Sequence, residues 1–326
     1  MDKFLQTLMD GFTVGSLYAL IALGYTMVYG ILQFINFAHG DVFALGVHLT
    51  IVFAAMLGIE GLATGGPASL PVVVGVLLLT MLACGCVGFL IERLAYRPLR
   101  SSPRLNVLIT AIGVSLLLQN VGQLPFVFGP YRKATPNLLP DVTLATIGGE
   151  QQTQDDGTLE IVGGVKVTLV NVTVVLVALA MMLALQYVIH STRFGLAMRA
   201  VSHDPRTAGL MGINVDLVIS LTFMIGSMLA AGAGFLYTLK YTGNVAHPGE
   251  ATWVLLGLKA FVAAVVGGIG NIRGAVLGGL LIGLTEFFGV GYLSSEYRDA
   301  YVFAILIVVL LVRPQGILGR PKIEKV

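Results

Sequence analysis

The chain has 326 residues, of which 56% are hydrophobic and 11% are charged, and its formal net charge is +2. Soluble domains carry about 25% charged residues, and a soluble protein of this length has too little interior for so much apolar surface, so a soluble fold is excluded. A mean hydropathy of +0.89 and 41 glycines, which suit close helix packing in lipid, predict an all-α polytopic membrane protein.

The apolar runs predict nine membrane helices, because a helix needs about 20 apolar residues to cross the hydrocarbon core. Three basic segments fall on one side in this count, and the positive-inside rule identifies that side as the cytoplasm. They are the loop from Arg93 to Arg104, the loop 190–216 and the tail from Arg313. The N-terminus is then outside and the C-terminus inside. The predicted helices are residues 11–33, 41–58, 71–92, 105–125, 170–189, 216–240, 252–269, 274–292 and 299–312.

The N-terminal part of the chain leaves the count open between eight and ten. Residues 1–12 lack a basic region and a small-residue cleavage site, so no cleaved signal peptide is expected. The count changes if the first eleven residues lie along the membrane surface, or if residues 34–41 are re-entrant. The whole chain, 1–326, is interpreted as a single transmembrane domain.

The sequence FINFAHGD, residues 34–41, interrupts the first long apolar run. It contains Asn36, His39 and Asp41, with Gly40 as a hinge. A break inside a membrane helix is tolerated only where it lines a cavity or is buried in protein. These residues therefore predict a translocation path, with their side chains satisfying freed backbone groups or gating a water-filled route. The alternative is an ordinary polar turn at the membrane surface.

The largest polar segment, residues 126–168, falls outside in this count. Its second half alternates in polarity and has turn signals at Asp156-Gly157 and Gly163-Gly164, which predict a small β-hairpin over residues 143–169. This external loop is either a solvated cap or a docking surface for a partner.

The loop 190–216 is the one long polar, basic and helix-compatible stretch in the C-terminal half. Asp204-Pro205 predicts the start of a short helix, with Asp204 as N-cap and Pro205 at the first helical position. Gly212 is a natural helix end. The segment is either an ordinary cytoplasmic loop or a docking helix for a cytoplasmic partner.

Two ionisable residues, Lys259 and Glu286, fall inside predicted helices, where a charge is costly unless it is paired or wet. They are at similar depth in an antiparallel pair of helices, so an ion pair or a shared polar patch is one hypothesis. The other is that each side chain snorkels to the outer interface.

The two predicted helices that carry Lys259 and Glu286, with the turn between them, also contain glycines spaced four residues apart. That spacing lets helix backbones approach closely. We expect them to pack helices within one bundle rather than between subunits. The glycines concerned are Gly270, Gly274, Gly278, Gly279 and Gly283.

Motifs that carry chemistry are missing from the sequence. There is no G-x-x-x-x-G-K-[ST], so ATP is not bound through a P-loop, and there is no H-E-x-x-H or G-x-S-x-G. Cys84 and Cys86 lie two apart in an apolar run and are interpreted as packing residues, and the five histidines are scattered. No catalytic or metal site is predicted, which disfavours an intramembrane enzyme.

Several motifs in order resemble one family. The segment GSLYALIALGYTMVYGILQFINFAHGDVFALG, residues 15–46, resembles the N-terminal signature of LivH-type permeases, the membrane subunits of branched-chain amino acid ABC importers. Residues 258–279, LKAFVAAVVGGIGNIRGAVLGG, and 313–321, RPQGILGRP, are also similar to that family. The resemblance covers nearly the whole chain, but residues 141–168 do not match it.

The resemblance implies a function for the loop 190–216, because its segment RAVSHDPRTAGLMGIN, residues 199–214, resembles the cytoplasmic loop that contacts the ATPase in such permeases. The coupling residues it implies are Arg199, Ala200, Asp204, Pro205, Ala208, Gly212, Ile213 and Asn214.

The family also implies the rest of an importer with an ABC-importer permease fold in a bacterial inner membrane. A LivM-like permease would pair with this chain, two ATPase subunits would bind inside, and a periplasmic binding protein would deliver the amino acid. ATP and magnesium would be bound by the ATPase subunits, so no cofactor is expected in this chain.

Two alternatives stay open at this point. Related ABC permeases serve urea, short amides or other amino acids, and nothing in these residues separates those substrates. An ATP-independent secondary transporter is the second alternative. Such proteins usually show inverted repeats and buried coupling carboxylates, whereas no clear repeat is visible here and Glu286 is the only carboxylate well inside a predicted helix.

Overall fold

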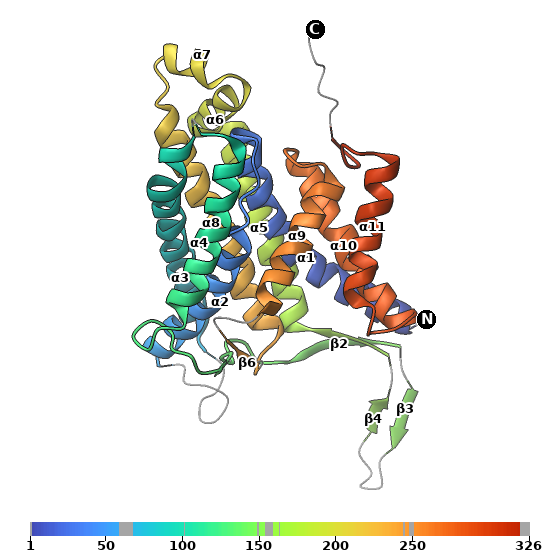
Figure 1. The fold of residues 1–326 in the computed structure, drawn as a ribbon. Helices are drawn as coiled ribbons and strands as arrows, with labels where there is room; N and C mark the ends of the chain where they lie inside the picture. The colour runs from blue at the N-terminus through green and yellow to red at the C-terminus, as the bar shows by residue number, and fades with distance from the viewer. Residues whose placement is uncertain are drawn as a thin grey trace.

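The computed structural model describes residues 2–58, 68–100, 102–148, 150–153, 159–162, 164–243, 245–247 and 251–319. Its core is a bundle of apolar helices (Figure 1), and each predicted membrane helix has a counterpart in it. The helices are α1 (Asp2–Leu32), α2 (His39–Met56), α3 (Leu70–Ile91), α4 (Arg104–Gly122), α5 (Leu169–Ser191), α6 (Arg193–His203), α7 (Pro205–Leu210), α8 (Val215–Lys240), α9 (Ala251–Gly267), α10 (Ile272–Tyr292) and α11 (Arg298–Val312).

Within the described residues, seven helices are long and apolar enough to cross a membrane: α1 to α5, α8 and α10. The apolar part of α9, Val254–Gly267, is shorter, and α11 has 15 residues. Beyond α3 the chain stays helical through a π-helix, Glu92–Tyr96, and a 3₁₀ turn, Arg97–Leu99. The basic segment after α3, expected to be a loop, therefore begins as a continuation of the helix.

The start of α1 differs most from the prediction, since the helix begins at Asp2 rather than at residue 11. The polar side chains of this first part have partners that the sequence could not show. Asp10 accepts from Lys240 Nζ at 2.8 Å, and Gln6 Oε1 accepts from the backbone N–H of Lys166 at 3.0 Å. Contacts with α8 and with Lys166 thus allow the helix to extend.

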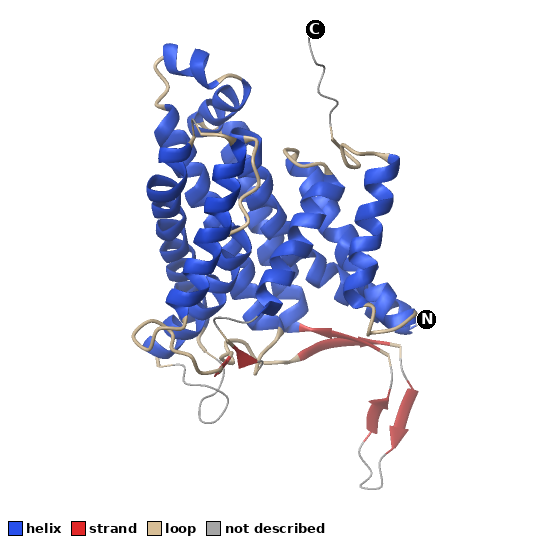
Figure 2. Cartoon of the chain, in the orientation of Figure 1, coloured by secondary structure: helices blue, strands red, loops and turns tan. Residues whose placement is uncertain are grey.

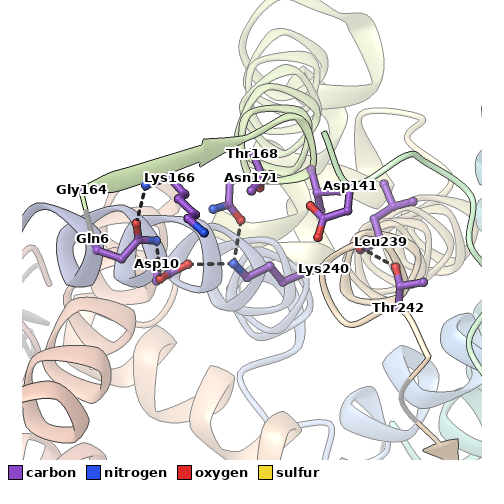
Figure 3. A pocket seen from close by; sticks show the side chains of 11 residues that line it. Gln6, Asp10, Asp141, Gly164, Lys166, Thr168, Asn171, Leu239, Lys240 and Thr242 are labelled. Carbon is purple, nitrogen blue, oxygen red and sulfur yellow. Dashed lines mark hydrogen bonds and ion pairs between the residues drawn. The ribbon is translucent and has the colours of Figure 1, made fainter. Parts of the chain in front are cut away.

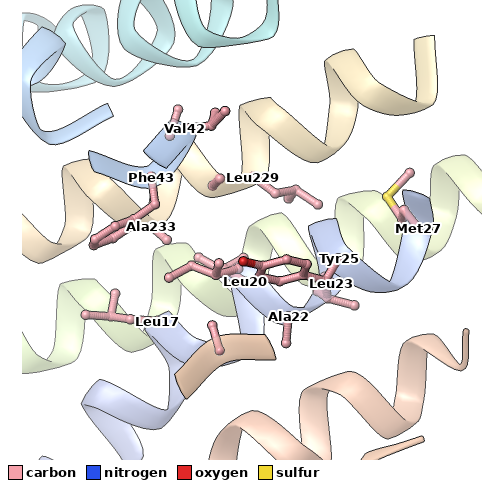
Figure 4. Close-up of a cluster of buried hydrophobic side chains, with 14 of the residues drawn as sticks. Leu17, Leu20, Ala22, Leu23, Tyr25, Met27, Val42, Phe43, Leu229 and Ala233 are labelled. Carbon is pink, nitrogen blue, oxygen red and sulfur yellow. The ribbon is translucent and has the colours of Figure 1, made fainter. Parts of the chain in front are cut away.

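The central helix is α1, which packs against α5, α8, α9 and α10. Figure 4 shows Leu20 and Leu23 of α1 beside Phe43 of α2 and Leu229 of α8. These side chains are buried, whereas α3, α4 and α5 carry exposed leucines such as Leu78, Leu116 and Leu183. The exposed faces of these outer helices are suited to lipid or to another membrane subunit.

Glycines bring α1, α9 and α10 into close contact. A Cβ on Gly279 or Gly283 would overlap the backbone of Ala19 or Gly15 in α1. One on Gly274 or Gly278 would overlap the backbone of α9. These four therefore pack helices within the bundle. Gly270 does not, because it lies in the turn before α10 with φ 91°, and a Cβ there would meet nothing within 4 Å.

The bundle has two different ends. Helices α6 and α7, the turn 268–271 and residues 313–319 lie at one end, which we call the loop end (Figure 1). The opposite end holds the start of α1 and the strands β2 to β5, and Figure 2 shows the larger strands only there. We call it the strand end. The three segments predicted to be basic and cytoplasmic all begin at the loop end.

The strands form antiparallel pairs, and a hairpin is present over the predicted range. Strand β2 (Thr143–Ile147) pairs with β5 (Val165–Thr168), and β3 (Glu150–Thr153) pairs with β4 (Leu159–Val162). A short pair joins β1 (Lys133–Ala134) to β6 (Val245–Ala246). The turn at Asp156-Gly157, the loop 59–67 and the tail from residue 320 lie outside the described residues.

Candidate functional site

The break between α1 and α2 lies inside the protein. The chain leaves α1 through Gln33, whose φ is 55°, and α2 begins with His39 packed beside Gly24, about two turns before the end of α1. Asn36, His39 and Asp41 are only 5%, 2% and 5% exposed. The connection therefore runs back into the bundle, and an ordinary turn at the membrane surface does not describe it.

Polar side chains from two other helices meet the break. Tyr96 Oη donates to Asn36 Oδ1 at 2.6 Å, and Asn36 Oδ1 also accepts from the backbone N–H of Ala38 at 3.1 Å. Asp41 Oδ1 accepts from Gln119 Nε2 of α4 at 2.8 Å. The break is thus tied to the π-helix after α3 and to α4, which gives Gln119 a partner in a helix that otherwise exposes many apolar side chains.

Gly40 allows the first turn of α2 to approach α9. A Cβ at Gly40 would lie 2.9 Å from the Cα of Gly257. Within the described residues, His39 Nε2 and Thr26 Oγ1 are buried without a hydrogen-bond partner. A buried polar atom without a partner costs about 1–3 kcal/mol, so each such atom requires a physical explanation, of which a role in function is one.

A cavity of about 600 Å³ opens at the loop end between α1, α6 and the turn 268–271. Thr26 lines it together with Gly30, Arg199 and Arg273. The cavity therefore adjoins the part of α1 against which the break packs. In the described part of the chain no group of three His, Cys, Asp or Glu could hold a metal ion, so this region can hold and orient polar groups but shows no metal-ligand set.

The helix pair α6 and α7 is held by its own caps. Thr192 Oγ1 accepts from the N–H of Gly195 at 3.1 Å at the start of α6. Asp204 caps α7, accepting from the N–H of Arg206 at 2.9 Å and from Thr207 Oγ1 at 2.5 Å. The hydrogen bond from the Thr207 hydroxyl has the largest effect on the Asp204 carboxyl. Together with the backbone N–H groups it lowers the pKa of this carboxyl below its ordinary value.

The end of α7 leads directly into α8. Gly212 adopts φ 83°, and the N–H of Ile213 donates to the carbonyl of Ala208 at 3.1 Å, which closes the helix. Asn214 then caps α8 by accepting from the N–H of Leu217 at 3.1 Å. The end of α7 and the start of α8 are therefore joined by a short connection that has its own hydrogen bonds.

The tip of α7 is apolar and exposed. Leu210 is 88% and Met211 is 79% exposed, whereas Ala208 on the opposite side is buried. Behind the tip, α6 rests on the end of α1, because Ser202 Oγ donates to the carbonyl of Gly30 at 2.5 Å and Arg199 donates to the carbonyl of Ile189. Ala200, in the same helix, is partly buried. The exposed tip of α7 thus follows a helix, α6, that is hydrogen-bonded to the ends of α1 and α5.

An ion network joins the start of α8 to the end of α3. Glu92 is fully buried and accepts from Arg100 and from the Ser220 hydroxyl. Arg100 also pairs with Asp216 at 2.5 Å, and Arg97 pairs with Asp216 nearer the surface. Since Tyr96 lies between Glu92 and Arg100 in the chain, the same network positions the phenol that contacts Asn36.

Lys259 and Glu286 lie together in the interior. Lys259 Nζ is 2.9 Å from Glu286 Oε1, and both side chains are buried, so the structure contains the ion pair that was one of the two alternatives. Arg298 Nε also binds Glu286 at 2.5 Å, Tyr18 Oη donates to it at 2.6 Å, and Asp299 pairs with Lys259 at 2.5 Å. Two cations and two carboxylates thus form a neutral cluster that joins α1, α9, α10 and the start of α11.

Sequence reasoning missed the residues that complete these clusters. They are ordinary in their local context, and only the fold brings them to the sites. The one available signal was that buried charges such as Glu286 require partners. The residues missed are Tyr18, Glu92, Tyr96, Asp216, Ser220, Arg298 and Asp299.

A multi-helix membrane bundle with a buried polar break and a capped, projecting helix at one end is the arrangement expected of a membrane permease. Comparison with known protein families identifies the kind of permease. The profile of the family described as the permease component of branched-chain amino acid transport systems matches residues 7–310. The chain belongs to this family, as the motifs in its sequence predicted.

Two permeases with branched-chain amino acid transport names match this chain over nearly their whole length. The chain is 43% identical over 324 residues to the high-affinity branched-chain amino acid transport system permease protein BraD of Pseudomonas aeruginosa, covering 99% of this chain and 98% of that protein. It is also 43% identical to the permease protein LivH of Escherichia coli over 323 residues, with the same coverage. A probable LivH of Methanocaldococcus jannaschii is 28% identical, covering 93% of this chain and 89% of that protein.

Proposed function

We propose that this chain forms half of the translocation path of an ATP-driven importer for branched-chain amino acids. Support comes from relatives that carry this transport name and match this chain over nearly their full length. The buried break at Asn36, His39, Gly40 and Asp41 supports this proposal, because irregular backbone within a membrane is tolerated only where it is buried in protein or lines a cavity.

The projecting tip of α7 is the observation that carries the ATP-driven part of the proposal. Two large apolar side chains, Leu210 and Met211, stand almost fully exposed at the end of a capped helix. Such a tip is unfavourable in water and fits a groove on a partner. The proposed partner there is a cytoplasmic ATPase subunit. The importer would contain two ATPase subunits, one bound to each of its two permeases.

The remaining partners follow from the same proposal. A LivM-like permease would cover part of the exposed apolar surface of the outer helices, and a periplasmic binding protein would dock at the strand end. ATP and magnesium would be bound by the ATPase subunits. The membrane would be a bacterial inner membrane with the loop end, and hence the C-terminus, in the cytoplasm.

Coupling would run from α7 to the break through contacts already described. A shift of α7 moves the start of α8, where Asp216 and Ser220 hold the Arg100–Glu92 pair. That pair positions Tyr96, which binds Asn36. Alternating access would then arise because ATP closes the ATPase pair, the two α7 tips move with it, and the helices around the break rock.

Co-purification from native membranes in mild detergent tests the proposal. The wild-type chain should bring down an ATPase subunit, and Leu210→Glu/Met211→Glu should lose it while the thermal unfolding of the bundle stays unchanged, because both side chains are exposed. Asp204→Arg/Gly212→Trp should also lose the ATPase. Leu144→Glu changes an exposed leucine at the strand end and is the control.

Reconstitution in liposomes completes the test. Leucine uptake should require ATP, the ATPase subunits and the binding protein, and urea should not be taken up. If the chain alone moves leucine without ATP, it is a secondary transporter and the proposal is wrong. If urea or a short amide is transported instead, the substrate is wrong although the ATP-driven part stands.

A further inference from the structure

A polar pocket of about 400 Å³ lies at the strand end, between α1, α5, α8 and β5 (Figure 3). We call it the strand-end pocket. Its volume falls within the range of about 300–1,000 Å³ that is typical of small-molecule sites. It is separate from the break, from the cavity at the loop end and from the Lys259–Glu286 cluster.

The floor of the strand-end pocket is a preformed hydrogen-bond network. Lys240 Nζ contacts Asp10 Oδ1 at 2.8 Å and Asn171 Oδ1 at 2.6 Å. Gln6 Nε2 donates to the other oxygen of Asp10 at 2.9 Å. Asn171 is buried, and the Lys240 side chain is mostly buried. The floor is therefore neutral overall and rigid, and it needs no further ion to balance its charge.

The rim carries one free charge of each sign. Lys166 projects from β5 and Asp141 from the segment before β2, and Figure 3 draws them on either side of Asn171 and Lys240. Both side chains are exposed, and neither has an ion pair or side-chain hydrogen bond among the residues that the structure describes. The pocket thus offers an unpaired ammonium and an unpaired carboxylate above a neutral floor, with Val170 and Leu239 as apolar lining.

We propose that the strand-end pocket binds the zwitterionic head of a free α-amino acid, with Lys166 facing its carboxylate and Asp141 its ammonium group. A simple anion or cation would satisfy one rim charge and leave the other without a partner. A zwitterion satisfies both, and charge-assisted hydrogen bonds are the stronger kind. The identity of the ligand as an amino acid rests on the proposed function, and the pocket would receive it before it enters the path.

A phosphatidylethanolamine headgroup offers the same pair of charges, so the test must separate the two sources. The assembled transporter, without binding protein, is placed in nanodiscs of phosphatidylglycerol and phosphatidylcholine, and equilibrium binding of radiolabelled leucine is measured. Leucinamide, which keeps the ammonium but lacks the carboxylate, and 4-methylpentanoate, which keeps only the carboxylate, are the competitors.

Two variants give opposite signatures if the proposal is right. Lys166→Gln should weaken leucine and 4-methylpentanoate binding and leave leucinamide unchanged, and Asp141→Asn should weaken leucine and leucinamide only. Each loss should be about tenfold or more, as expected for one hydrogen bond to a charged group. Lys133→Gln and Glu296→Gln remove charges elsewhere at the same end and should have no effect. Unchanged thermal unfolding shows that the variants are folded.

Several outcomes would overturn the inference. In a complex that still imports leucine with ATP and binding protein, one such outcome is that neither variant changes leucine binding. A second is that no leucine binding is detected at millimolar concentration. In either case the proposed function stands and the pocket is not its receiving site. Another is that Lys166→Gln and Asp141→Asn alter only the retention of phosphatidylethanolamine by the complex purified from native membranes, measured by mass spectrometry. If the wild-type complex shows no ATP-driven leucine uptake, the proposed function itself is contradicted.

Discussion

Tyr96 Oη donates a 2.6 Å hydrogen bond to Asn36 Oδ1, which ties the π-helix Glu92–Tyr96 to the break between α1 and α2. The phenol is fully buried and packs against Phe34 and Phe223, with ring centroids 5.4 Å apart in each case. A contact held this firmly can transmit movement at the loop end to the polar break.

Replacing Tyr96 with phenylalanine should lower the transport rate per ATP hydrolysed. The ring and its packing are kept, and only a hydrogen bond worth about 0.5–1.5 kcal/mol is lost, which corresponds to at most about a tenfold effect. Leucine uptake and ATP hydrolysis are measured in the same liposomes. Tyr187→Phe, on the exposed face of α5, is the control. An unchanged ratio of uptake to hydrolysis in Tyr96→Phe would rule out this contact as a transmission element.

Breaking the Glu92–Arg100 pair should cost much stability, and a second substitution should restore much of it. In Arg100→Gln, the fully buried Glu92 carboxylate loses its cation, which costs about 3–5 kcal/mol in buried pairs. Adding Glu92→Gln should recover much of this loss, because no unpaired charge remains. Thermal unfolding in detergent is the measurement. Arg97→Gln breaks a pair that is 40% and 44% exposed and should cost about 1 kcal/mol or less. Equal losses in Arg97→Gln and Arg100→Gln would contradict the importance of burial.

The membrane helices could be predicted from the sequence because the bilayer imposes their length and polarity. The Lys259–Glu286 pair could be given as one of two alternatives for a related reason, since a charge inside a membrane helix requires a partner or water, and the structure contains that pair. The caps of α7 were visible too, because Asp204-Pro205 and Gly212 act through local backbone geometry.

Long-range contacts set the limit of the sequence reasoning. The arginines after α3 indicated a surface loop, but the helix continues, because Glu92 meets Arg100 and Ser220, and Ser220 is 128 residues away in the chain. The early start of α1 depends in the same way on Lys240. No local pattern distinguishes these residues from similar ones that face water.

The Lys259–Glu286 cluster predicts strong coupling between its members. Lys259→Met should lower the free energy of unfolding by about 3 kcal/mol, the lower end for a broken buried pair, because Arg298 still faces Glu286. Glu286→Gln should also destabilise, and the double variant should be less unstable than the sum of the two. The folded fraction after heating, measured by size-exclusion chromatography, gives the three values. Independent, additive losses would show that Lys259 and Glu286 do not stabilise each other.

The glycines of α10 predict which small residues hold the bundle together. Gly279→Ala and Gly283→Ala each place a methyl group against the backbone of α1, and such overpacking costs about 1–3 kcal/mol. Gly113→Ala in α4 is the matched control, because its Cβ would meet nothing within 4 Å and alanine favours a helix. Thermal unfolding should therefore shift downward for the two α10 variants and remain the same or rise for Gly113→Ala. Equal stability of all three variants would mean that α1 and α10 are not packed as closely as the structure shows.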